Sequence, residues 1–312
     1  MTTPDVALGL ARTAAALDSG APSAATLAAR LPPWLVAATN QFAWERTLTG
    51  PDQIDLQFGV ARDSALPDPG SAPWANGPWA PVLDAIGRWR RGELPFVPRL
   101  FVEVDNTPLG APLRPLVFPG LSAPDPLGWG LAAMALLNLQ SAGSCPAAIS
   151  QGVLAVVRAV PAGGAGTYVA WMGARGTPHA RWIGSVPIDA LALFLAQVGW
   201  PGDADEVAQT VGTFVRGSSH VQLGFDVGLE GVGSRLGVEL FWAHPIGGDP
   251  RMDHALGLLA DWPEVDAARL DGAARWSRAQ DLGHDLEPRL QLKLGWDQGR
   301  RAAKAYLGCW NL

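Results

Sequence analysis

Residues 289–310, RLQLKLGWDQGRRAAKAYLGCW, alternate between polar and apolar side chains in two runs separated by the polar residues 297–300. A period of two is typical of a β-strand with one buried face. The polar members of the two runs share one face: Arg289, Gln291, Lys293, Lys304 and Tyr306. The stretch therefore predicts an antiparallel hairpin. Because a two-stranded hairpin is marginally stable alone, we expect it to belong to a larger sheet with a hydrophobic layer.

The two lysines of the chain both lie in this hairpin, whereas the other 21 basic residues are arginines. If residues 297–300 form the loop, Trp296 pairs with Arg301 and Lys293 pairs with Lys304. Two ammonium groups directly opposite each other on a ladder repel. The lysine pair therefore predicts an anion between them.

Composition limits the function classes open to this chain. Its 312 residues are 48% hydrophobic, enough for a sizeable core, and its net charge of −6 argues against a nucleic-acid-binding surface, which is normally basic. Two distant cysteines, Cys145 and Cys309, indicate a reduced protein rather than a disulfide framework. The first twenty residues lack the features of a signal peptide, and no run of about 20 apolar residues occurs. We expect a cytoplasmic protein with neither a nucleic-acid nor a membrane partner.

Strand and helix patterns alternate along the chain. In the first half we expect a helix from Pro32-Pro33 through Trp44, strands at 54–60, 99–105 and 116–118, helices at 81–91 and 128–140, and a long surface loop at 62–80. In the second half we expect strands at 153–160 and 167–172 joined by the turn 161–166, helices at 188–198 and 203–216, strands at 220–227 and 235–242, helices at 252–261 and 265–277, and the hairpin 289–310. Short turns make the paired strands antiparallel, so no parallel crossover is needed.

The fold class follows from the two faces of these strands. Helices are expected to cover the apolar face, and the polar face then lines the lumen of a barrel or meets bulk water. The polar faces of these strands are rich in Asp, Glu, Arg, Gln and His, whereas exposed strand faces usually carry Thr, Ser and Lys. This composition favours a barrel whose polar faces line the lumen. We predict a partly mobile segment at 1–24 and a single α+β domain at 25–312. Its architecture is an antiparallel β-barrel of repeated ββαα units with helices outside, and an open antiparallel sheet with helices on one face is the alternative.

Several catalytic motifs are absent from the sequence. It contains no GxxxxGK[ST] loop, no HExxH, no CxxC, no GxSxG elbow and no DDxxD stretch. The glycine-rich PAGGAG at 161–166 has no lysine and is interpreted as a turn. The five histidines lack metal-ligand spacing, so we expect no metal site formed by the protein.

Candidate functional residues remain on the polar strand faces. A cationic patch suited to a diphosphate comprises Lys293, Lys304, Tyr306, Arg158 and Arg235. Glu103 and Glu239 are the candidate general bases. The predicted lumen wall comprises Asp55, Gln57, Phe101, Tyr168, His220, Gln222, Asp226, Phe241, Gln291 and Trp310. For any single charged residue the alternative is one half of a cross-strand ion pair.

The repeated helix and hairpin units, together with KAY at 304–306, resemble the ABBA-type prenyltransferases. The resemblance in architecture covers residues 150–312, and Lys304 and Tyr306 match the K-x-Y strand motif of that family, with Lys293 in a matching role on the preceding strand. It implies an isoprenoid diphosphate bound in a barrel with no tightly bound cofactor, and leaves Mg²⁺ open. It also implies that Glu103 or Glu239 takes the acceptor proton. The family uses several tyrosines to shield the allylic cation, whereas this chain has two.

A second resemblance rests on DVGLEGVGSRLGVEL (226–240) and on the KAYLG stretch, which are similar to uncharacterised bacterial proteins encoded near peptide natural-product genes. Together these features predict transfer of an isoprenoid from an allylic diphosphate to a peptide or aromatic acceptor inside the barrel. The alternatives are a non-catalytic peptide- or metabolite-binding partner and another peptide-modifying enzyme on the same scaffold.

Overall fold

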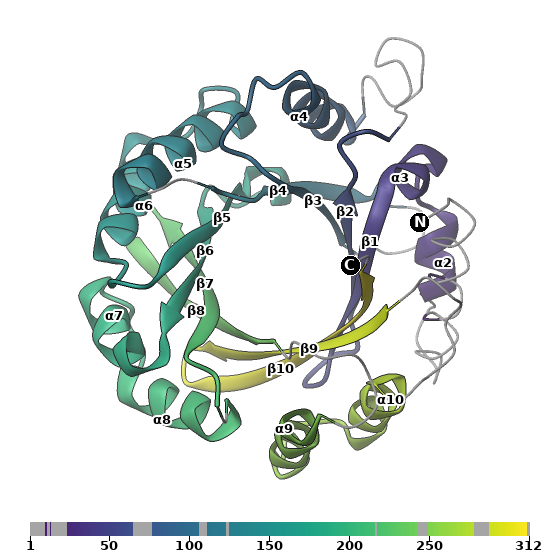
Figure 1. Ribbon diagram of the computed structural model, residues 1–312, viewed down its shortest axis with the longest axis vertical. Helices are drawn as coiled ribbons and strands as arrows, with labels where there is room; N and C mark the ends of the chain where they lie inside the picture. The colour runs from purple at the N-terminus through teal and green to yellow at the C-terminus, as the bar shows by residue number, and fades with distance from the viewer. Residues whose placement is uncertain are drawn as a thin grey trace.

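Ten strands form the wall of a barrel, and the helices lie around its outside (Figure 1). The strands follow one another in the order β4-β3-β2-β1-β10-β9-β8-β7-β6-β5, and every neighbouring pair is antiparallel. The computed structural model describes Leu10, Thr13 and residues 24–64, 77–105, 111–122, 125–215, 217–241, 249–277 and 287–310. The predicted α+β barrel with outer helices is confirmed.

The order of the elements repeats a pair of strands followed by helices. The strands are β1 (Thr39–Thr47), β2 (Ile54–Val60), β3 (Leu100–Asp105), β4 (Arg114–Pro119), β5 (Ala165–Trp171), β6 (Ala180–Pro187), β7 (His220–Gly228), β8 (Gly231–Leu240), β9 (Glu287–Asp297) and β10 (Arg300–Trp310). The α-helices are α2 (Ala24–Ala29), α3 (Pro33–Ala38), α4 (Ala80–Arg90), α5 (Pro126–Gln140), α6 (Ala147–Ala159), α7 (Leu191–Gln197), α8 (Ala204–Phe214), α9 (Pro250–Ala260) and α10 (Ala267–Ser277). Two short 3-10 helices are η1 (Gly173–Arg175) and η2 (Ile188–Ala190).

The hydrophobic core lies between the sheet and the helices. In β3 and β7 buried and less buried residues alternate, as the period of two predicted. The outward residues Trp44, Trp182 and Phe225 are fully buried, and the rings of Trp182 and Phe225 pack with centroids 5.3 Å apart. Helices therefore cover the apolar strand face, which leaves the polar face to line the lumen.

The barrel wall closes where β4 and β5 meet. There Gly120 and Tyr168 form an antiparallel bridge, and the Leu121 amide donates to the Thr167 carbonyl at 2.7 Å. The side chain of Gln140, the last residue of α5, spans the same seam: its amide donates to the Val117 carbonyl of β4 at 3.3 Å, and its oxygen accepts from the Trp171 amide of β5 at 2.5 Å. A helix side chain thus supplies hydrogen bonds where the ladder between these strands is short.

The closing hairpin has the predicted register. Lys293 pairs with Lys304 and Trp296 pairs with Arg301. The loop is the two-residue turn Gln298-Gly299, with φ values of 49° and 77°. Positive φ at both central residues is typical of a type I′ turn, whose twist matches that of a hairpin.

Two predictions about the strands are wrong. The expected helix through Trp44 ends at Ala38, because residues 39–47 form a strand that pairs with both β2 and β10. The expected strand at 153–160 is part of α6, whose buried side chains recur at helical spacing. The corresponding hairpin is instead β5–β6, so residues 161–164 connect a helix to a strand.

Some expectations fall largely beyond the described residues. The predicted mobile segment 1–24 is described only at Leu10, Thr13 and Ala24, and Leu10 and Thr13 are buried. Most of the predicted loop 62–80 lies outside the description as well. Within the described ranges, no helix combines the length and the apolar character needed to cross a bilayer.

Candidate functional site in the barrel lumen

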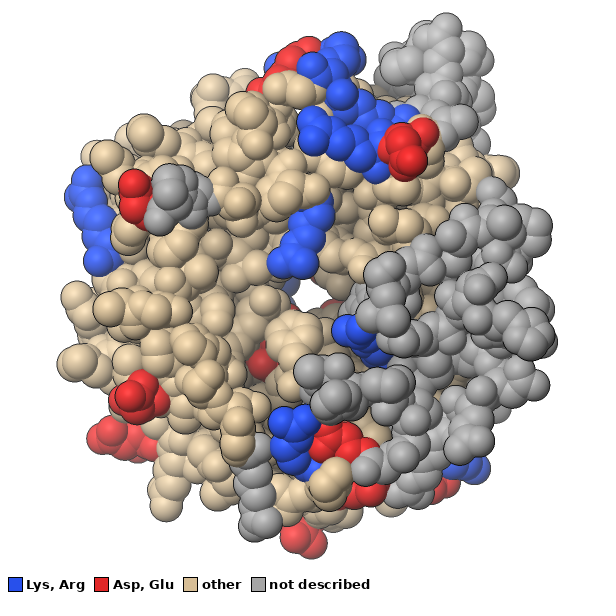
Figure 2. Space-filling view, in the orientation of Figure 1, with Lys and Arg blue, Asp and Glu red and all other residues tan. Residues whose placement is uncertain are grey.

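The barrel lumen holds two connected cavities of different character. One has a volume of about 450 Å³ and is lined mainly by charged side chains; we call it the charged half. The other has a volume of about 380 Å³ and is lined mainly by aromatic and amide side chains; we call it the aromatic half. The residues that line both are Gln57, Phe118, Ile183, Glu239 and Tyr306. Figure 2 shows an opening at the centre of one face of the molecule, with basic side chains near its rim.

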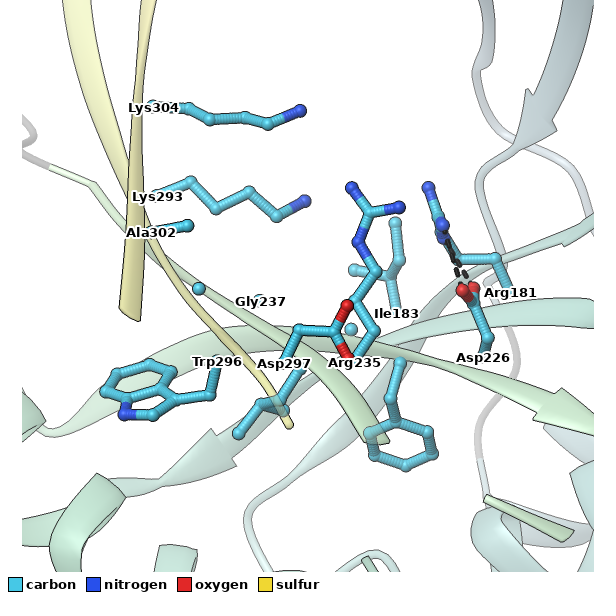
Figure 3. A pocket seen from close by; sticks show the side chains of 14 residues that line it. Arg181, Ile183, Asp226, Arg235, Gly237, Lys293, Trp296, Asp297, Ala302 and Lys304 are labelled. Atoms are coloured by element: carbon cyan, nitrogen blue, oxygen red, sulfur yellow. Dashed lines mark hydrogen bonds and ion pairs between the residues drawn. The ribbon is translucent and has the colours of Figure 1, made fainter. Parts of the chain in front are cut away.

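The charged half contains nearly equal numbers of acids and bases. Its basic residues are Arg114, Arg175, Arg181, Arg235, Lys293 and Lys304. Its acidic residues are Glu45, Asp55, Glu103, Asp105 and Glu239. A smaller cavity of about 80 Å³ adjoins it, lined in part by Arg181, Arg235, Lys293 and Lys304. These four side chains point into one space in Figure 3.

Each lysine of the hairpin has a carboxylate partner on the strand beside it. Lys293 donates to Glu239 of β8 at 3.0 Å, and Lys304 donates to Glu45 of β1. These flanking carboxylates offset the repulsion between the two ammonium groups. The predicted anion between the lysines is therefore not needed to offset their repulsion, and it stays a prediction.

The electrostatics of Glu45, Lys304 and Tyr306 are coupled. Burial would raise the pKa of Glu45, but the charges of Lys304 and Lys293 outweigh burial and lower it to about 2. Burial opposes the charge on Lys304, yet Glu45 raises the pKa of the ammonium. Burial, followed by the negative charges of Glu45 and Glu239, raises the pKa of Tyr306 well above its ordinary value. At neutral pH the site thus holds an ion pair beside a neutral phenol.

Two further groups of ion pairs occupy the opposite arc of the lumen. Arg175 of η1 contacts Glu103 at 2.5 Å and also contacts Asp105, both on β3. Arg181 of β6 donates to Asp226 of β7 at 2.8 Å. Burial alone would lower the pKa of Arg181, but its hydrogen bonds with Asp226 and the negative charges of Asp226, Glu103 and Glu45 together raise it. The structure shows Glu103 and Asp226 in ion pairs, which was the alternative to a direct functional role.

The aromatic half combines rings with carboxamides. Phe101 and Tyr168 pack edge to face with centroids 5.7 Å apart, and the guanidinium of Arg99 lies 5.4 Å from the centre of the Tyr168 ring. Burial raises the pKa of Tyr168 to about 12. Gln222 and Gln291 donate to the same oxygen of Glu239, at 2.5 and 3.0 Å. Glu239 therefore accepts three hydrogen bonds at the border between the two halves.

Most of the predicted site residues come together in the lumen. Those that line one or more of its cavities are Asp55, Gln57, Phe101, Glu103, Tyr168, Gln222, Asp226, Arg235, Glu239, Phe241, Gln291, Lys293, Lys304 and Tyr306. The prediction for Arg158 is wrong, because it lies on the exposed face of α6. His220 is exposed at the start of β7, where its ring contacts Ser219 and the Gly163 carbonyl. The side chain of Trp310 lies outside the described residues.

Sequence reasoning missed lumen residues on the two strands that it did not predict. Gln41 and Glu45 belong to β1, which had been interpreted as a helix, and Arg181 belongs to β6. The alternation in 180–187 was the available signal for β6, whereas residues 41–47 show no clear alternation. Arg175 follows β5 in a 3-10 turn and had no such signal.

The donor set of the described residues does not form a metal centre by itself. No group of three or more His, Cys, Asp or Glu side chains among them is arranged to hold a metal ion. The nearest neighbours of the lumen carboxylates are instead lysine, arginine and glutamine side chains.

Solved structures of three prenyltransferases have a similar fold. The 5-dimethylallyl tryptophan synthase from Streptomyces coelicolor, in complex with DMASPP and Trp, is 15% identical with a TM-score of 0.53, and the match covers 98% of this chain and 94% of that chain. AnaPT from Neosartorya fischeri is 10% identical with a TM-score of 0.54, covering 98% and 91%. PriB in its complex with product diphosphate is 15% identical with a TM-score of 0.54, covering 98% and 96%.

No protein-family model and no curated protein matches the chain. The likeness to the solved structures spans nearly the whole chain. It therefore includes the first half, whereas the resemblance found in the sequence covered residues 150–312 only. The barrel described here therefore has the fold of the ABBA-type prenyltransferases.

Proposed function

We propose that this protein transfers an isoprenoid from an allylic diphosphate to an aromatic or peptide acceptor inside the barrel. The observation that supports this proposal is the division of the lumen, in which a cavity that holds six basic and five acidic side chains meets an aromatic cavity at Glu239 and Tyr306. Among the proteins that share the fold, one binds DMASPP and Trp and another binds product diphosphate.

The reaction breaks the bond between the allylic carbon and the diphosphate oxygen, and the electron pair leaves with the diphosphate. Lys293, Lys304 and Arg235 would stabilise the negative charge that develops on this leaving group. The rings of Tyr306 and Tyr168 would stabilise the allylic cation through their faces. Electrons of the acceptor then form the new bond to the allylic carbon, and the acceptor loses a proton.

Glu239 is the better placed of the two predicted bases. It lines both halves of the lumen, so it can reach an acceptor in the aromatic half. Glu103 lines the charged half and pairs with Arg175 at 2.5 Å. We assign proton removal to Glu239 and a positioning role toward Arg175 to Glu103.

The ion pairs of the lumen set a condition on donor binding. A diphosphate that contacts both lysines comes close to Glu45 and Glu239, which already pair with them. An ammonium has three N–H donors, so each lysine can contact its carboxylate and a phosphate oxygen together, but the negative charges of the two acceptors repel. A Mg²⁺ ion carried on the diphosphate would offset this repulsion, so we expect donor affinity to rise when Mg²⁺ is added.

Calorimetric binding of dimethylallyl and geranyl diphosphates tests the donor site. We expect both Lys304→Ala and Arg235→Gln to lower the affinity at least tenfold, since each removes a cation from the lumen. Arg158→Ala is the matched control, because it removes a cation from the outer face of α6. Absence of binding to the wild type, or equal affinities in all four proteins, would contradict the proposal.

Turnover is tested by incubating the protein with donor and aromatic or peptide acceptors and measuring acceptor mass. One C5 unit added in place of a hydrogen is the expected increment, and Glu239→Gln should reduce its rate. A non-catalytic binding partner is the second candidate, favoured by the fact that both lysines are already neutralised by carboxylates. It predicts ligand binding with no mass increment for any acceptor.

A further inference from the structure

The aromatic half contains four glutamines in two different states. Gln222 and Gln291 are held by Glu239. Gln41 and Gln57 also line this cavity and are half-buried, but neither carboxamide has a hydrogen-bond partner among the described residues. Neither carboxamide is among the fully buried side-chain groups that lack a partner, so both keep contact with solvent in this cavity. These two carboxamides are therefore available to a ligand that offers both donors and acceptors.

Gln41 is directed along the aromatic wall by a glycine. The register places Gln41 beside Gly59, Gly59 beside Phe101 and Phe101 beside Phe118, in one row across β1 to β4. A Cβ on Gly59 would lie 2.2 Å from Cγ and 2.3 Å from Nε2 of Gln41. The Gln41 side chain therefore lies across the backbone of Gly59, on the side where Phe101 stands. A strand glycine often marks such a close approach.

Gln57 follows one step deeper on the same wall. It pairs with Ala43 and with Glu103, two positions along β3 from Phe101. It also lines the charged half, so it lies at the border between the two halves. The aromatic wall thus carries one unpaired carboxamide in the row of Phe101, that of Gln41, and another in the row of Glu103, that of Gln57.

The aromatic half is open to solvent beside Phe241 and Arg99. Phe241 and Arg99 both line it and are exposed, with Phe241 at 49% of its full exposure. A ligand larger than the cavity can therefore place one ring inside and continue into solvent. This geometry fits an aromatic side chain that projects from a longer chain.

We propose that the acceptor is an aromatic residue within a peptide, with Gln41 and Gln57 binding the backbone amides that flank its ring. A carboxamide donates and accepts through the same geometry as a peptide group, so the two are complementary. The proposal rests on the proposed function only in calling this ligand the acceptor. Its recognition chemistry can be measured without any transfer reaction.

The test compares ligands that share a ring and differ in amides. N-acetyl-tryptophanamide is set against 3-methylindole, and N-acetyl-tyrosinamide against p-cresol, by calorimetry on the wild-type protein. The amide form gains hydrogen bonds that the bare ring cannot make, so we expect it to bind roughly tenfold tighter than the bare ring. Equal affinity within either pair would overturn the inference, and this arm requires no variant.

Variants assign the preference to the two carboxamides. Gln57→Leu and Gln41→Leu should each remove most of the preference for the amide form while the affinity for the bare ring changes less than twofold. Gln151→Leu, on the exposed face of α6, is the matched control. A variant that weakens both members of a pair equally would show a general packing role instead.

The outcome is separable from that of the proposed function. If the amide preference depends on Gln41 and Gln57 but no prenyl increment forms, peptide recognition stands and the transferase assignment fails. If bare rings are prenylated as fast as their amide forms, the transferase assignment stands and the peptide inference is wrong.

Discussion

Charged residues in the lumen are held as pairs, and Glu45 with Lys304 shows the consequence for stability. The folded-state pKa of Glu45 is about 2, against an ordinary value of 4.5, because the two lysines outweigh its burial. A depressed carboxyl pKa contributes stability that is fully present above the unfolded pKa and is lost as pH falls toward the folded pKa. The contribution of Glu45 should therefore disappear between about pH 4.5 and pH 2.

Urea unfolding at several pH values checks this prediction. Glu45→Gln should be less stable than the wild type at pH 7, because Lys304 loses its partner, and the difference should shrink as pH falls below 4.5. Glu230→Gln, in the exposed turn between β7 and β8, should follow the wild-type profile. A stability difference that stays constant from pH 7 to pH 3 would show that Glu45 is not the titrating group.

Gly237 positions the lysine on the neighbouring strand. A Cβ at Gly237 would lie 2.3 Å from Cε of Lys293, so the lysine side chain lies directly over the β8 backbone. Gly237→Ala should displace the ammonium and weaken diphosphate binding about as much as Lys293→Ala does. The double variant should lose little more, because two changes that act through one group are not additive.

The control for Gly237→Ala is Gly257→Ala. Gly257 lies on the exposed side of α9, and a Cβ there meets nothing within 4 Å. This substitution should leave diphosphate binding unchanged and stabilise the helix by up to about 1 kcal/mol. Additive losses from Gly237→Ala and Lys293→Ala would rule out the positioning role.

At the scale of elements, α5 maintains the closure of the barrel through Gln140. Its side chain hydrogen-bonds to Val117 of β4 and Trp171 of β5, which meet at the seam. Gln140→Leu leaves these backbone groups without partners and should destabilise the protein by about 1–3 kcal/mol per unsatisfied group. Hydrogen exchange at the Trp171 amide should accelerate more than exchange within β9 and β10.

Asn138→Ala tests whether the effect is specific to the seam. Asn138 lies on the exposed side of the same helix. Its replacement should change the free energy of unfolding by less than about 0.5 kcal/mol, as is usual for surface sites. Normal exchange at Trp171 in Gln140→Leu would mean that the bridge between Gly120 and Tyr168 is sufficient for closure.

At the scale of the whole molecule, one sheet runs through the complete barrel wall. Its first strands pair with its last, β1 with β10. We therefore predict that residues 25–312 unfold as a single domain. Tryptophan fluorescence and far-UV circular dichroism should give coincident urea transitions, whereas two separated transitions would indicate independent units.

Local pattern was enough to predict much of this architecture. The alternation in 54–60 gave the bounds of β2, and the pattern of 289–310 gave the register of Lys293 opposite Lys304. Asp203 caps α8, accepting from the Glu206 amide three positions along the chain at 2.9 Å. These features depend on neighbouring residues and on turn chemistry, so the sequence alone contains them.

Partners distant in sequence were decided by the tertiary structure. Lys304 meets Glu45 across 259 residues, and β1 is a strand because β2 and β10 pair with both of its edges. The tertiary structure also decided the closure between β4 and β5 and the division of the lumen into a charged and an aromatic half. The sequence by itself determined alternating faces, turns and helix ends, since each depends on residues within a few positions. Only the closed barrel decided which charges meet, because burial and ion pairing depend on strands that the chain brings together from its two halves.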